Sequence, residues 1–459
     1  MSQDLDPAVS VLVPTGALGA GIQREHVWAG LAAGADAIAC DAGSTDSGPA
    51  YLATGRPKYS RGAVKADLAI LMLAQAKAGI PLLIGSCGTS GADAALDWTC
   101  EIALEIAAEH GLSPRIALLR SEQDPEAMAA KAGAGRIRPL APHKEAPPEL
   151  FRSCDRIVAL MGPEPYVAAL EAGADIVLGG RTTDTAVLAA VPLSRGAGAG
   201  PAWHAGKIGE CGGLCTRRTR EGGVMIRVRA DSFDVEPLAA TNACDPYSVS
   251  SHMLYENADP FLLTEPGGVL DVREAVYEAI DDRRVRVRGS AFRPQPYTMK
   301  LEGAAGGPFQ TVALVGIQDP EVLANLERFL AQMQAVMRRR LAEAMPGLPD
   351  DAVTLRPYGW NAVSGLTPPA GTPPPREVGL MLVATGPDQA TATQIAKTCN
   401  PLLFHMPLDP ETELPSYAFP FSPAEIERGQ VYEFRLNHVV EVDDPLELVR
   451  ISFVDAGAR

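Results

Sequence analysis

The chain has 459 residues, of which 46% are hydrophobic and 21% are charged, a balance typical of a globular protein with two or three domains. Its formal net charge of −16 argues against a surface that binds nucleic acid. There is no run of about 18 apolar residues and no apolar segment near the acidic N-terminus, so we expect neither a membrane span nor a signal peptide.

The first 200 residues alternate short apolar runs with helical patterns. Alternation of this kind predicts parallel βαβ units, and thus an N-terminal α/β domain over residues 1–200. The expected strands are 9–13, 37–40, 81–84, 116–119, 157–160 and 176–178, and the expected helices are 24–33, 62–78, 92–109, 126–132 and 165–172.

A glycine-rich segment at 196–201 predicts a flexible boundary, and the pattern changes beyond it. Residues 201–459 favour a strand-rich α+β domain that completes a cleft with the first domain. Strands are expected at 224–228, 285–288, 297–301 and 310–317, a long amphipathic helix at 320–345, and further elements at 377–384, 389–398, 432–439 and 448–453. The proline-rich segment 367–375 is typical of an extended surface connector.

Two stretches share one local pattern, in which a Gly-Ala-Asp turn leads through a short strand into a loop with Thr-Asp between hydroxyl residues. The loops are 41–48 and 179–185. Loops after the carboxyl ends of parallel strands bind ligands in open α/β sheets. Capping of the following helices by Ser and Thr is the alternative, but two matched loops, one carrying Arg181, favour a shared ligand site. The expected substrate-binding residues here are Asp41, Ser44, Thr45, Arg181, Thr182 and Thr183.

A third loop, 85–91, follows a strand and begins a helix, so its backbone N–H groups are candidates for holding an anion. Gly85, Ser86 and Gly88 are its expected substrate-binding residues. The loop lacks the lysine of a P-loop and matches no dinucleotide fingerprint. Cys87 is either a reactive thiol at a helix N-terminus or a small packing residue.

Residues 204–211 place an imidazole, an ammonium, a carboxylate and a thiol close together in sequence. Lys207 is suited to pair with a substrate carboxylate or, if desolvated, to act as a base, and Glu210 is suited to acid–base work. Cys211 is a second candidate reactive thiol. His204 and Cys211 are candidate metal ligands, although their spacing matches no standard zinc site. The eight cysteines are scattered, which favours free thiols in a reducing cytoplasm.

Two further pairs of charged residues have a spacing that brings side chains together. His252 and Glu256 would share one face of a helix, where an ordinary salt bridge is the favoured interpretation over a catalytic pair. Lys300 and Glu302 are two positions apart on an expected strand, so their side chains share one face. If that face lines a cleft, they are a candidate proton-transfer pair, and if it faces solvent, they are an inert pair. His405 and His438 are expected to be structural.

Several of these segments, taken together and in order, resemble the acyclic terpene utilisation AtuA-like family. They are 41–49, 180–184, 204–211, 252–256, 300–303 and 419–423. The resemblance implies breakdown of branched acyl compounds or small organic acids, without defining a mechanism. Members of the family often have a small companion domain, fused or separate, so the resemblance leaves open a separate small partner subunit here. The chain departs from the family pattern at 52–55 and 86–89, so the substrate does not carry over.

We expect a lyase of the hydratase or dehydratase type that acts on a small hydroxy- or polycarboxylic acid or its thioester. The sequence offers no nucleophile triad, cofactor fingerprint or iron–sulfur cysteine set, while acidic and basic residues are frequent in the expected cleft. The alternatives are a carbon–carbon lyase on a branched 3-hydroxyacyl-CoA and a non-catalytic subunit. No cofactor is recognisable, a divalent metal stays open, and a homo-oligomer is the default. The candidate catalytic residues are Asp46, Asp184, Lys207, Glu210, Lys300 and Glu302.

Overall fold

The computed structural model describes residues 8–369 and 371–457, and its fold is α/β, as the alternating pattern predicts. Its contacts divide the chain into two compact units. Unit 1 comprises Met1–Ala305 and Phe434–Arg459, and unit 2 comprises Gly306–Glu433. The boundary expected near residue 200 is not where the structure divides, because helix α9 (Ala199–Gly209) lies across that position inside unit 1.

The glycines that suggested a flexible boundary serve close packing instead. A Cβ atom on Gly198 would lie 1.9 Å from the carbonyl oxygen of Ala230, and one on Gly200 would lie 2.3 Å from that of Ser290. Only glycine lets the start of α9 approach these backbones so closely. The same composition that is typical of a linker therefore marks a tight helix contact here.

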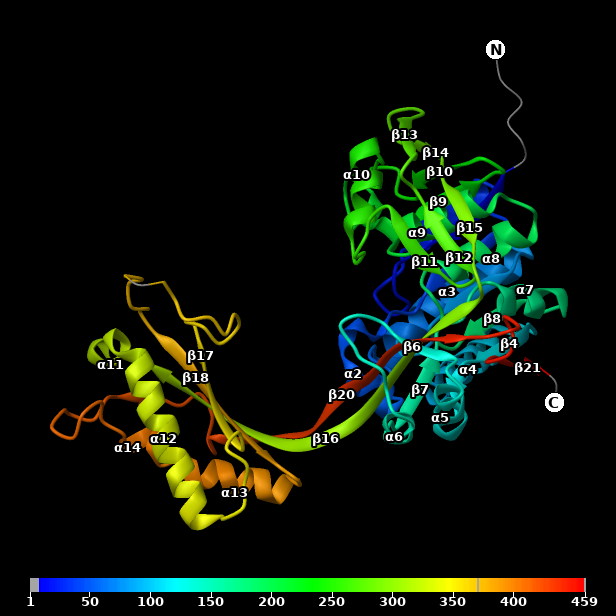
Figure 1. The fold of residues 1–459 in the computed structure, drawn as a ribbon. Helices are drawn as coiled ribbons and strands as arrows, with labels where there is room; N and C mark the ends of the chain where they lie inside the picture. The colour runs from blue at the N-terminus through cyan, green and yellow to red at the C-terminus, as the bar shows by residue number, and fades with distance from the viewer. Residues whose placement is uncertain (1–7, 370, 458–459) are drawn as a thin grey trace. The chain divides into compact units, whose positions relative to one another are not determined.

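Unit 1 is built on a mixed sheet with the strand order β13-β14-β10-β9-β1-β2-β3-β8-β4-β21 (Figure 1). The strands β1, β2, β3, β8 and β4 are parallel to their neighbours in this run, and antiparallel strands extend the sheet on both sides. The bounds are β1 (Val9–Val13), β2 (Ala37–Asp41), β3 (Leu82–Gly85), β4 (Arg115–Arg120), β8 (Ile176–Gly179), β9 (Val224–Val228), β10 (Ser232–Pro237), β13 (Val276–Ala279), β14 (Val285–Arg288) and β21 (Arg450–Asp455).

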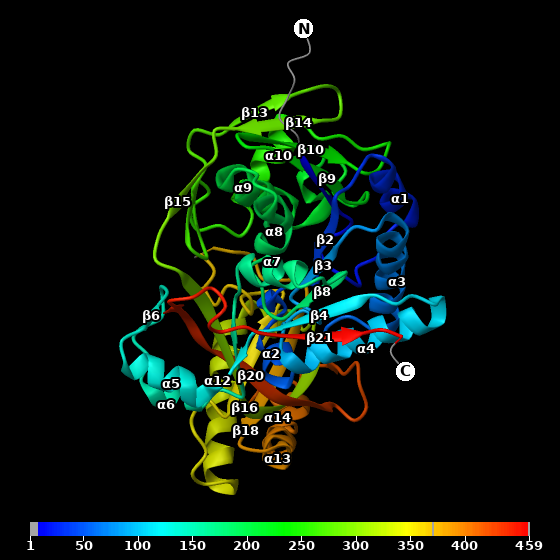
Figure 2. The same cartoon turned by 90° about the vertical axis from the view of Figure 1, so that its right-hand side faces the viewer.

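Helices cover both faces of this sheet, because side chains alternate between faces along each buried strand. Leu12 and Ile38 pack with the residues of α1, α3 and α4, whereas Val11 and Ala37 pack with those of α7, α8 and α9. Figure 2 shows these two groups of helices on either side of the strands. The bounds are α1 (Arg24–Ala32), α3 (Arg61–Ala78), α4 (Asp93–His110), α7 (Glu164–Glu171) and α8 (Ala186–Ser194).

One strand of the predicted parallel series belongs elsewhere. Strand β7 (Arg156–Ala159) pairs antiparallel with β5 (Glu122–Gln123) and with the long strand β16 (Thr298–Ile317), so it is not a parallel member of the main sheet. This pairing places Glu302 directly opposite Val158. The expected strands at 297–301 and 310–317 are the two ends of β16, which continues from unit 1 into unit 2.

The remaining elements of unit 1 are short. A separate antiparallel sheet has the order β11-β12-β15. The bounds are β6 (Ile137–Pro139), β11 (Leu262–Glu265), β12 (Gly268–Asp271), β15 (Ala291–Pro294), α2 (Pro49–Thr54), α5 (Pro125–Gly133), α6 (Pro148–Arg152) and α10 (Pro246–Ser251), with 3-10 turns η1 (Thr45–Ser47), η2 (Gly212–Cys215) and η3 (His252–Leu254).

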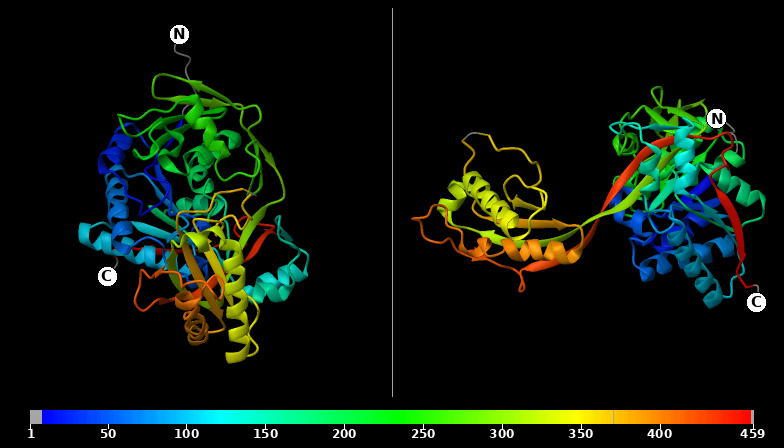
Figure 3. Two further views of the ribbon diagram at one scale, coloured as in Figure 1. Left: turned by 90° about the vertical axis from the view of Figure 1, so that its left-hand side faces the viewer. Right: turned by 60° about the horizontal axis from the view of Figure 1, so that its bottom comes forward.

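Unit 2 has its own apolar core. Strand β18 pairs antiparallel with β17 and with the second part of β16, and side chains of these strands pack against α12 and α13, which Figure 3 draws in yellow and orange. The expected helix at 320–345 is divided at Asn325. The bounds are α11 (Pro320–Ala324), α12 (Leu326–Ala344), β17 (Val353–Tyr358), β18 (Val378–Gly386), α13 (Gln389–Cys399), α14 (Leu402–His405), β19 (Tyr417–Ala418) and β20 (Glu425–Glu441), whose last part belongs to unit 1.

Candidate functional site

The three loops singled out in the sequence lie at one edge of the main sheet, because β2, β3 and β8 are adjacent parallel strands. The hydroxyl of Ser86 donates to the carbonyl oxygen of Thr182 at 3.3 Å, and Arg181 Nη1 donates to Ser86 Oγ at 3.1 Å. A Cβ on Gly43 would lie 3.0 Å from the side chain of Thr89. These contacts show that the three loops lie close together; the shared ligand site expected of them stays a prediction.

A pocket of about 700 Å³ opens beside two of these loops, within unit 1. Its size is within the range of small-molecule sites. Nine of the predicted site residues line it, namely Ser44, Asp46, Arg181, Thr183, Asp184, Lys207, Glu210, Lys300 and Glu302. Residues that the sequence did not single out complete its lining, among them Thr185, Asp259, Glu265 and Thr298.

Arg181 and Glu302 form the buried ionic centre of one wall. Arg181 Nε donates to Glu302 Oε2 at 3.0 Å, and both side chains are about 95% buried. Thr45 and Lys300 donate to the same carboxylate, each at 2.9 Å, and Asp184 lies 3.3 Å from Arg181 Nη1. Protein carboxylates thus pair with Nε and Nη1 of Arg181, and a role for Arg181 in binding substrate stays a prediction.

The electrostatics of this wall keep Glu302 ionised. Burial alone would raise the pKa of Glu302, but the charges of Arg181 and Lys300 outweigh it and hold the pKa at about 2. Burial would lower the pKa of Arg181, and the same carboxylate outweighs that effect. For Asp184, burial prevails over the charges of Arg181 and Lys207, and its pKa is raised.

Glu265 is the most important lining residue that sequence reasoning missed. It is the last residue of β11 and is 8% exposed. Burial raises its pKa to about 7, even though the hydroxyls of Thr185 and Thr183 hydrogen-bond to it. Residues 262–265 alternate between exposed and buried positions, and the carboxylate falls on a buried one directly before a Pro-Gly-Gly turn. The residues Leu-Leu-Thr-Glu show no alternation of apolar and polar types, so the sequence carried no signal of this burial.

Lys207 and Glu210 form a second buried ion pair, at the carboxyl end of α9. Burial raises the pKa of Glu210 well above its usual range, and the opposing charge of Lys207 does not restore it. Burial would lower the pKa of Lys207, but Glu210 outweighs it and the pKa is raised. Lys207 is therefore a cation, and not the neutral base that its position had allowed.

The remaining predicted substrate-binding residues lie behind the lining. Asp41 and Thr182 are almost fully buried, and burial raises the pKa of Asp41 well above its usual range. Thr182 Oγ1 lies 2.8 Å from the hydroxyl of Tyr166. These residues, with Thr45 and Ser86, contact the lining and not the pocket, so they are positioning residues.

Four backbone N–H groups of the loop 85–91, the expected anion site, are engaged within the protein. The N–H groups of Ser86, Cys87, Thr89 and Gly91 donate to carbonyl oxygens of the protein, so they are not free to bind a ligand. Gly85 ends β3, and Gly88 has a φ of +67° with a would-be Cβ only 2.6 Å from Ala95. Both glycines meet backbone requirements and do not line the pocket.

Neither candidate thiol has the character of a nucleophile. Cys87 has no exposed surface, and burial together with Asp41 raises its pKa. Cys211 is partly exposed, and burial followed by the charge of Glu210 raises its pKa as well. A protonated thiol is a weak nucleophile, so Cys87 is a packing residue.

Two histidines have different surroundings from those that the sequence predicted. His204 lies 2.7 Å from Ser290 Oγ and 3.1 Å from the hydroxyl of Tyr277, and burial lowers its pKa to about 3, so it is structural and not a metal ligand. His252 and Glu256 do not share a helix face, because α10 ends at Ser251 and Glu256 has a φ of +59°.

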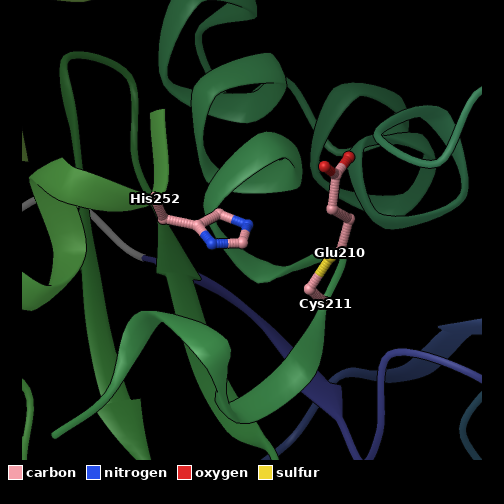
Figure 4. Close-up of side chains that lie close together, drawn as sticks. All are labelled: Glu210, Cys211 and His252. Carbon is pink, nitrogen blue, oxygen red and sulfur yellow. The ribbon is translucent and has the colours of Figure 1, made fainter. Parts of the chain in front are cut away.

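Another histidine-containing group has the chemistry of a metal site. Glu210, Cys211 and His252 each offer a ligand atom, and these atoms lie within 4.8 Å of one another. Figure 4 shows the imidazole of His252 directed toward the chain segment that carries Glu210 and Cys211. Carboxylate, thiol and imidazole are all zinc ligands.

Carboxylates outnumber cations among the described residues of the pocket lining. The cations are Arg181, Lys207 and Lys300, and the carboxylates are Asp46, Asp184, Glu210, Glu256, Asp259, Glu265 and Glu302. Each of the three cations is within 4 Å of a carboxylate oxygen. The pocket thus favours proton transfer over binding of a highly charged anion.

A family model described as Acyclic terpene utilisation family protein AtuA matches residues 48–417, and the chain belongs to this family. Comparison with curated proteins found no match, and comparison with solved structures found none. Over the described residues, no helix combines the length and the apolar character needed to cross a membrane. Apart from Ser44, Asp46 and Val439, the lining of the pocket falls inside the matched range.

Proposed function

We propose that this member of the acyclic terpene utilisation family is a lyase of the hydratase or dehydratase type. Its substrate would be a small hydroxy acid or a hydroxyacyl thioester. The observation that carries the proposal is Glu265, a buried carboxyl group at the pocket whose pKa of about 7 suits both accepting and donating a proton near neutral pH.

The proposed reaction assigns one step to each type of group. Glu265 removes the proton beside the substrate carbonyl, and the electrons of that C–H bond form the new double bond. The C–O bond to the hydroxyl group breaks, and this group leaves as water after accepting a proton from Asp184, whose raised pKa suits an acid. Lys300, with 40% of its side chain exposed, donates a hydrogen bond to the carbonyl oxygen as charge develops there.

The charge of the pocket narrows the substrate class. A tricarboxylate would meet the excess of carboxylates in the lining, and its own charges would find no cation that lacks a partner there. A thioester or a monocarboxylate brings less negative charge. Of the substrates expected from the sequence, the proposal therefore favours hydroxyacyl thioesters over polycarboxylic acids.

Turnover by the purified chain tests the proposal. A panel of 3-hydroxyacyl thioesters and hydroxy acids would be followed by the absorbance of the conjugated double bond. We expect Glu265→Gln to lower kcat by about 10²–10⁴-fold with little change in KM. Glu171→Gln, at an exposed position of α7, is the matched control and should leave kcat unchanged.

Two results would contradict the proposal in different ways. Full activity of Glu265→Gln would overturn the assignment of the base but not the reaction class. A folded wild-type chain that turns over no candidate would overturn the lyase itself. If such a chain still gained thermal stability with a thioester, a non-catalytic subunit would be favoured.

The second candidate is a carbon–carbon lyase on a branched 3-hydroxyacyl thioester. The group of Glu210, Cys211 and His252 favours it, because cleavage next to a hydroxyl-bearing carbon is assisted by a metal ion that holds the oxygen atoms. Chromatographic detection of two carbonyl fragments, in place of an unsaturated product, would distinguish this reaction from dehydration.

A further inference from the structure

We propose that Glu210, Cys211 and His252 bind a single Zn²⁺ ion. Their ligand atoms lie within 4.8 Å of one another, a separation that one ion can bridge with small side-chain adjustments. The proposal does not rest on the proposed function, because binding of a metal can be measured without any substrate.

The backbone that carries two of the ligands is held in place by glycines. Glu210 follows the last residue of α9 and keeps a helical conformation, and Cys211 comes next. A Cβ on Gly16 would lie 2.7 Å from the backbone of Cys211, and one on Gly212, which has a φ of +59°, would lie 2.8 Å from the amide nitrogen of Gly16. The two segments are therefore closely packed, and Cys211 cannot shift toward the loop after β1 without displacing it. The ligand pair is thus preorganised.

His252 supplies an independent observation. Its side chain is buried, with 5% of the residue exposed, and Nε2 has no hydrogen-bond partner. Figure 4 shows this ring directed toward Glu210 and Cys211. The ring stacks on Tyr255 at 5.6 Å between centroids, which restricts its orientation. A buried nitrogen without a partner is costly, and a metal ion would satisfy its lone pair.

The imidazole of His252 is available as a ligand, because its buried Nε2 has no hydrogen-bond partner. A neutral imidazole binds metals through its free lone pair. Lys207 donates to Oε1 of Glu210, while Oε2 accepts no hydrogen bond from a described residue, so one carboxylate can serve both the lysine and the ion.

The donor set favours zinc over the common hard cations. Calcium and magnesium prefer oxygen ligands, whereas a thiolate with an imidazole and a carboxylate is a set for zinc and similar ions. On binding, the thiol of Cys211 loses its proton to solvent, and the thiolate and carboxylate balance the two charges of the ion. Three protein ligands leave one position for water or another molecule, and Glu210 also lines the pocket.

The experiment uses the untagged full-length chain, freed of metal with a chelator. Zn²⁺ is titrated against a chromophoric competitor, and Co²⁺ is titrated separately as a spectroscopic probe. We expect one Zn²⁺ per chain and, with Co²⁺, a thiolate-to-metal charge-transfer band. Cys211→Ser should abolish this band, and both Cys211→Ser and His252→Gln should weaken Zn²⁺ binding by more than the ~10–100-fold that loss of an outer-sphere partner costs.

Two variants serve as matched controls. Cys154→Ser replaces a buried thiol that contacts the carbonyl of Leu150 at 3.5 Å, and a serine hydroxyl can keep this contact. His110→Ala removes an exposed imidazole at the end of α4. Both should bind Zn²⁺ as the wild type does, and circular dichroism should show all four variants to be folded.

Absence of the charge-transfer band in the wild type would overturn the proposal without any variant. Unchanged affinity in both Cys211→Ser and His252→Gln would also overturn it, because the ion would then lie elsewhere. Failure here leaves the lyase proposal intact, since the proton transfers assigned to Glu265 and Asp184 need no metal. Conversely, a metal-binding chain without lyase activity would overturn only the proposed function.

Discussion

Glu302 and Glu265 line the same pocket, and both are almost fully buried. Their pKa values nevertheless depart in opposite directions from that of an ordinary glutamate. Glu302 has a pKa of about 2, because Arg181 and Lys300 outweigh its burial. Glu265 has a pKa of about 7, because the hydroxyl groups of Thr185 and Thr183 and the charge of Lys207 do not outweigh its burial. Burial is common to both, so the partners decide the outcome. The first carboxylate is a fixed charge, and the second is a proton carrier.

Removing the fixed charge should give the largest loss of stability. Glu302→Gln leaves Arg181 with Asp184 as its remaining carboxylate and leaves a cation buried without its main partner. Breaking a buried ion pair in this way costs about 3–5 kcal/mol. Urea unfolding at pH 7 measures it, with Glu171→Gln as the exposed control.

The same reasoning adds a structural role to the one assigned to Arg181 from the sequence. Arg181→Ala was expected to affect substrate binding, but it also removes the buried cation that pairs with Glu302 and leaves Lys300, whose side chain is 40% exposed, as the remaining cation at this carboxylate. Its stability loss should therefore approach that of Glu302→Gln. A loss below about 1 kcal/mol in both variants, typical of an exposed pair, would show that the two regions of the pocket do not differ as described.

Glu265→Gln should raise the stability of the folded chain at high pH, whereas Glu302→Gln should lower it. The folded-state pKa of about 7 lies above the ordinary value of 4.5, so the folded chain binds more protons between these values. Stability from this group is therefore present below pH 4.5 and is lost as the pH rises through 7. Above pH 7 the ionised carboxylate costs roughly 3 kcal/mol, and glutamine removes that cost.

The measurement is the difference in unfolding free energy between Glu265→Gln and wild type at pH 5 and at pH 8. We expect the variant to gain stability at pH 8 and to differ little at pH 5. Equal differences at both values would mean that Glu265 does not titrate in this range, and the general base would have to be another residue.

The sequence predicted one of these two regions better than the other. The alternation of strands and helices, together with the matched Thr-Asp loops, placed Arg181 and Asp184 at the right edge of the sheet. Lys300 and Glu302 were recognised as sharing a face because strand side chains alternate with a period of two. These are local regularities, and they were sufficient for most elements of the main sheet.

What the sequence did not predict depends on contacts between distant residues. Arg181 and Glu302 are 121 positions apart, and nothing local indicates that they pair. The domain boundary was misplaced because glycines that pack α9 closely have the composition of a linker. Glu265 was missed because its importance arises from burial in the folded chain.

Thr185→Val tests how far the hydroxyl groups moderate the titration of Glu265. The hydroxyl of Thr185 favours the ionised form, and valine keeps the shape without the donor. Loss of a hydrogen bond worth about 1 kcal/mol should raise the pKa of Glu265 by somewhat less than one unit. The rise of the rate with pH, which reports ionisation of the general base, would then move to higher pH by this amount. If it does not move, this rise reports the ionisation of a group other than Glu265.

Lys300→Met should have the smallest effect on stability, and this separates the two partners of Glu302. The side chain of Lys300 is 40% exposed, so solvent screens its interaction, and Glu302 keeps Arg181 as a buried partner. We expect a stability loss below about 1 kcal/mol. If Lys300 holds the substrate carbonyl, the same variant should lower kcat/KM by about 10–100-fold, the value of a hydrogen bond to a charged group. A stability loss as large as that of Glu302→Gln would instead make Lys300 part of the fixed ionic centre, and the oxygen of the substrate would need a different donor.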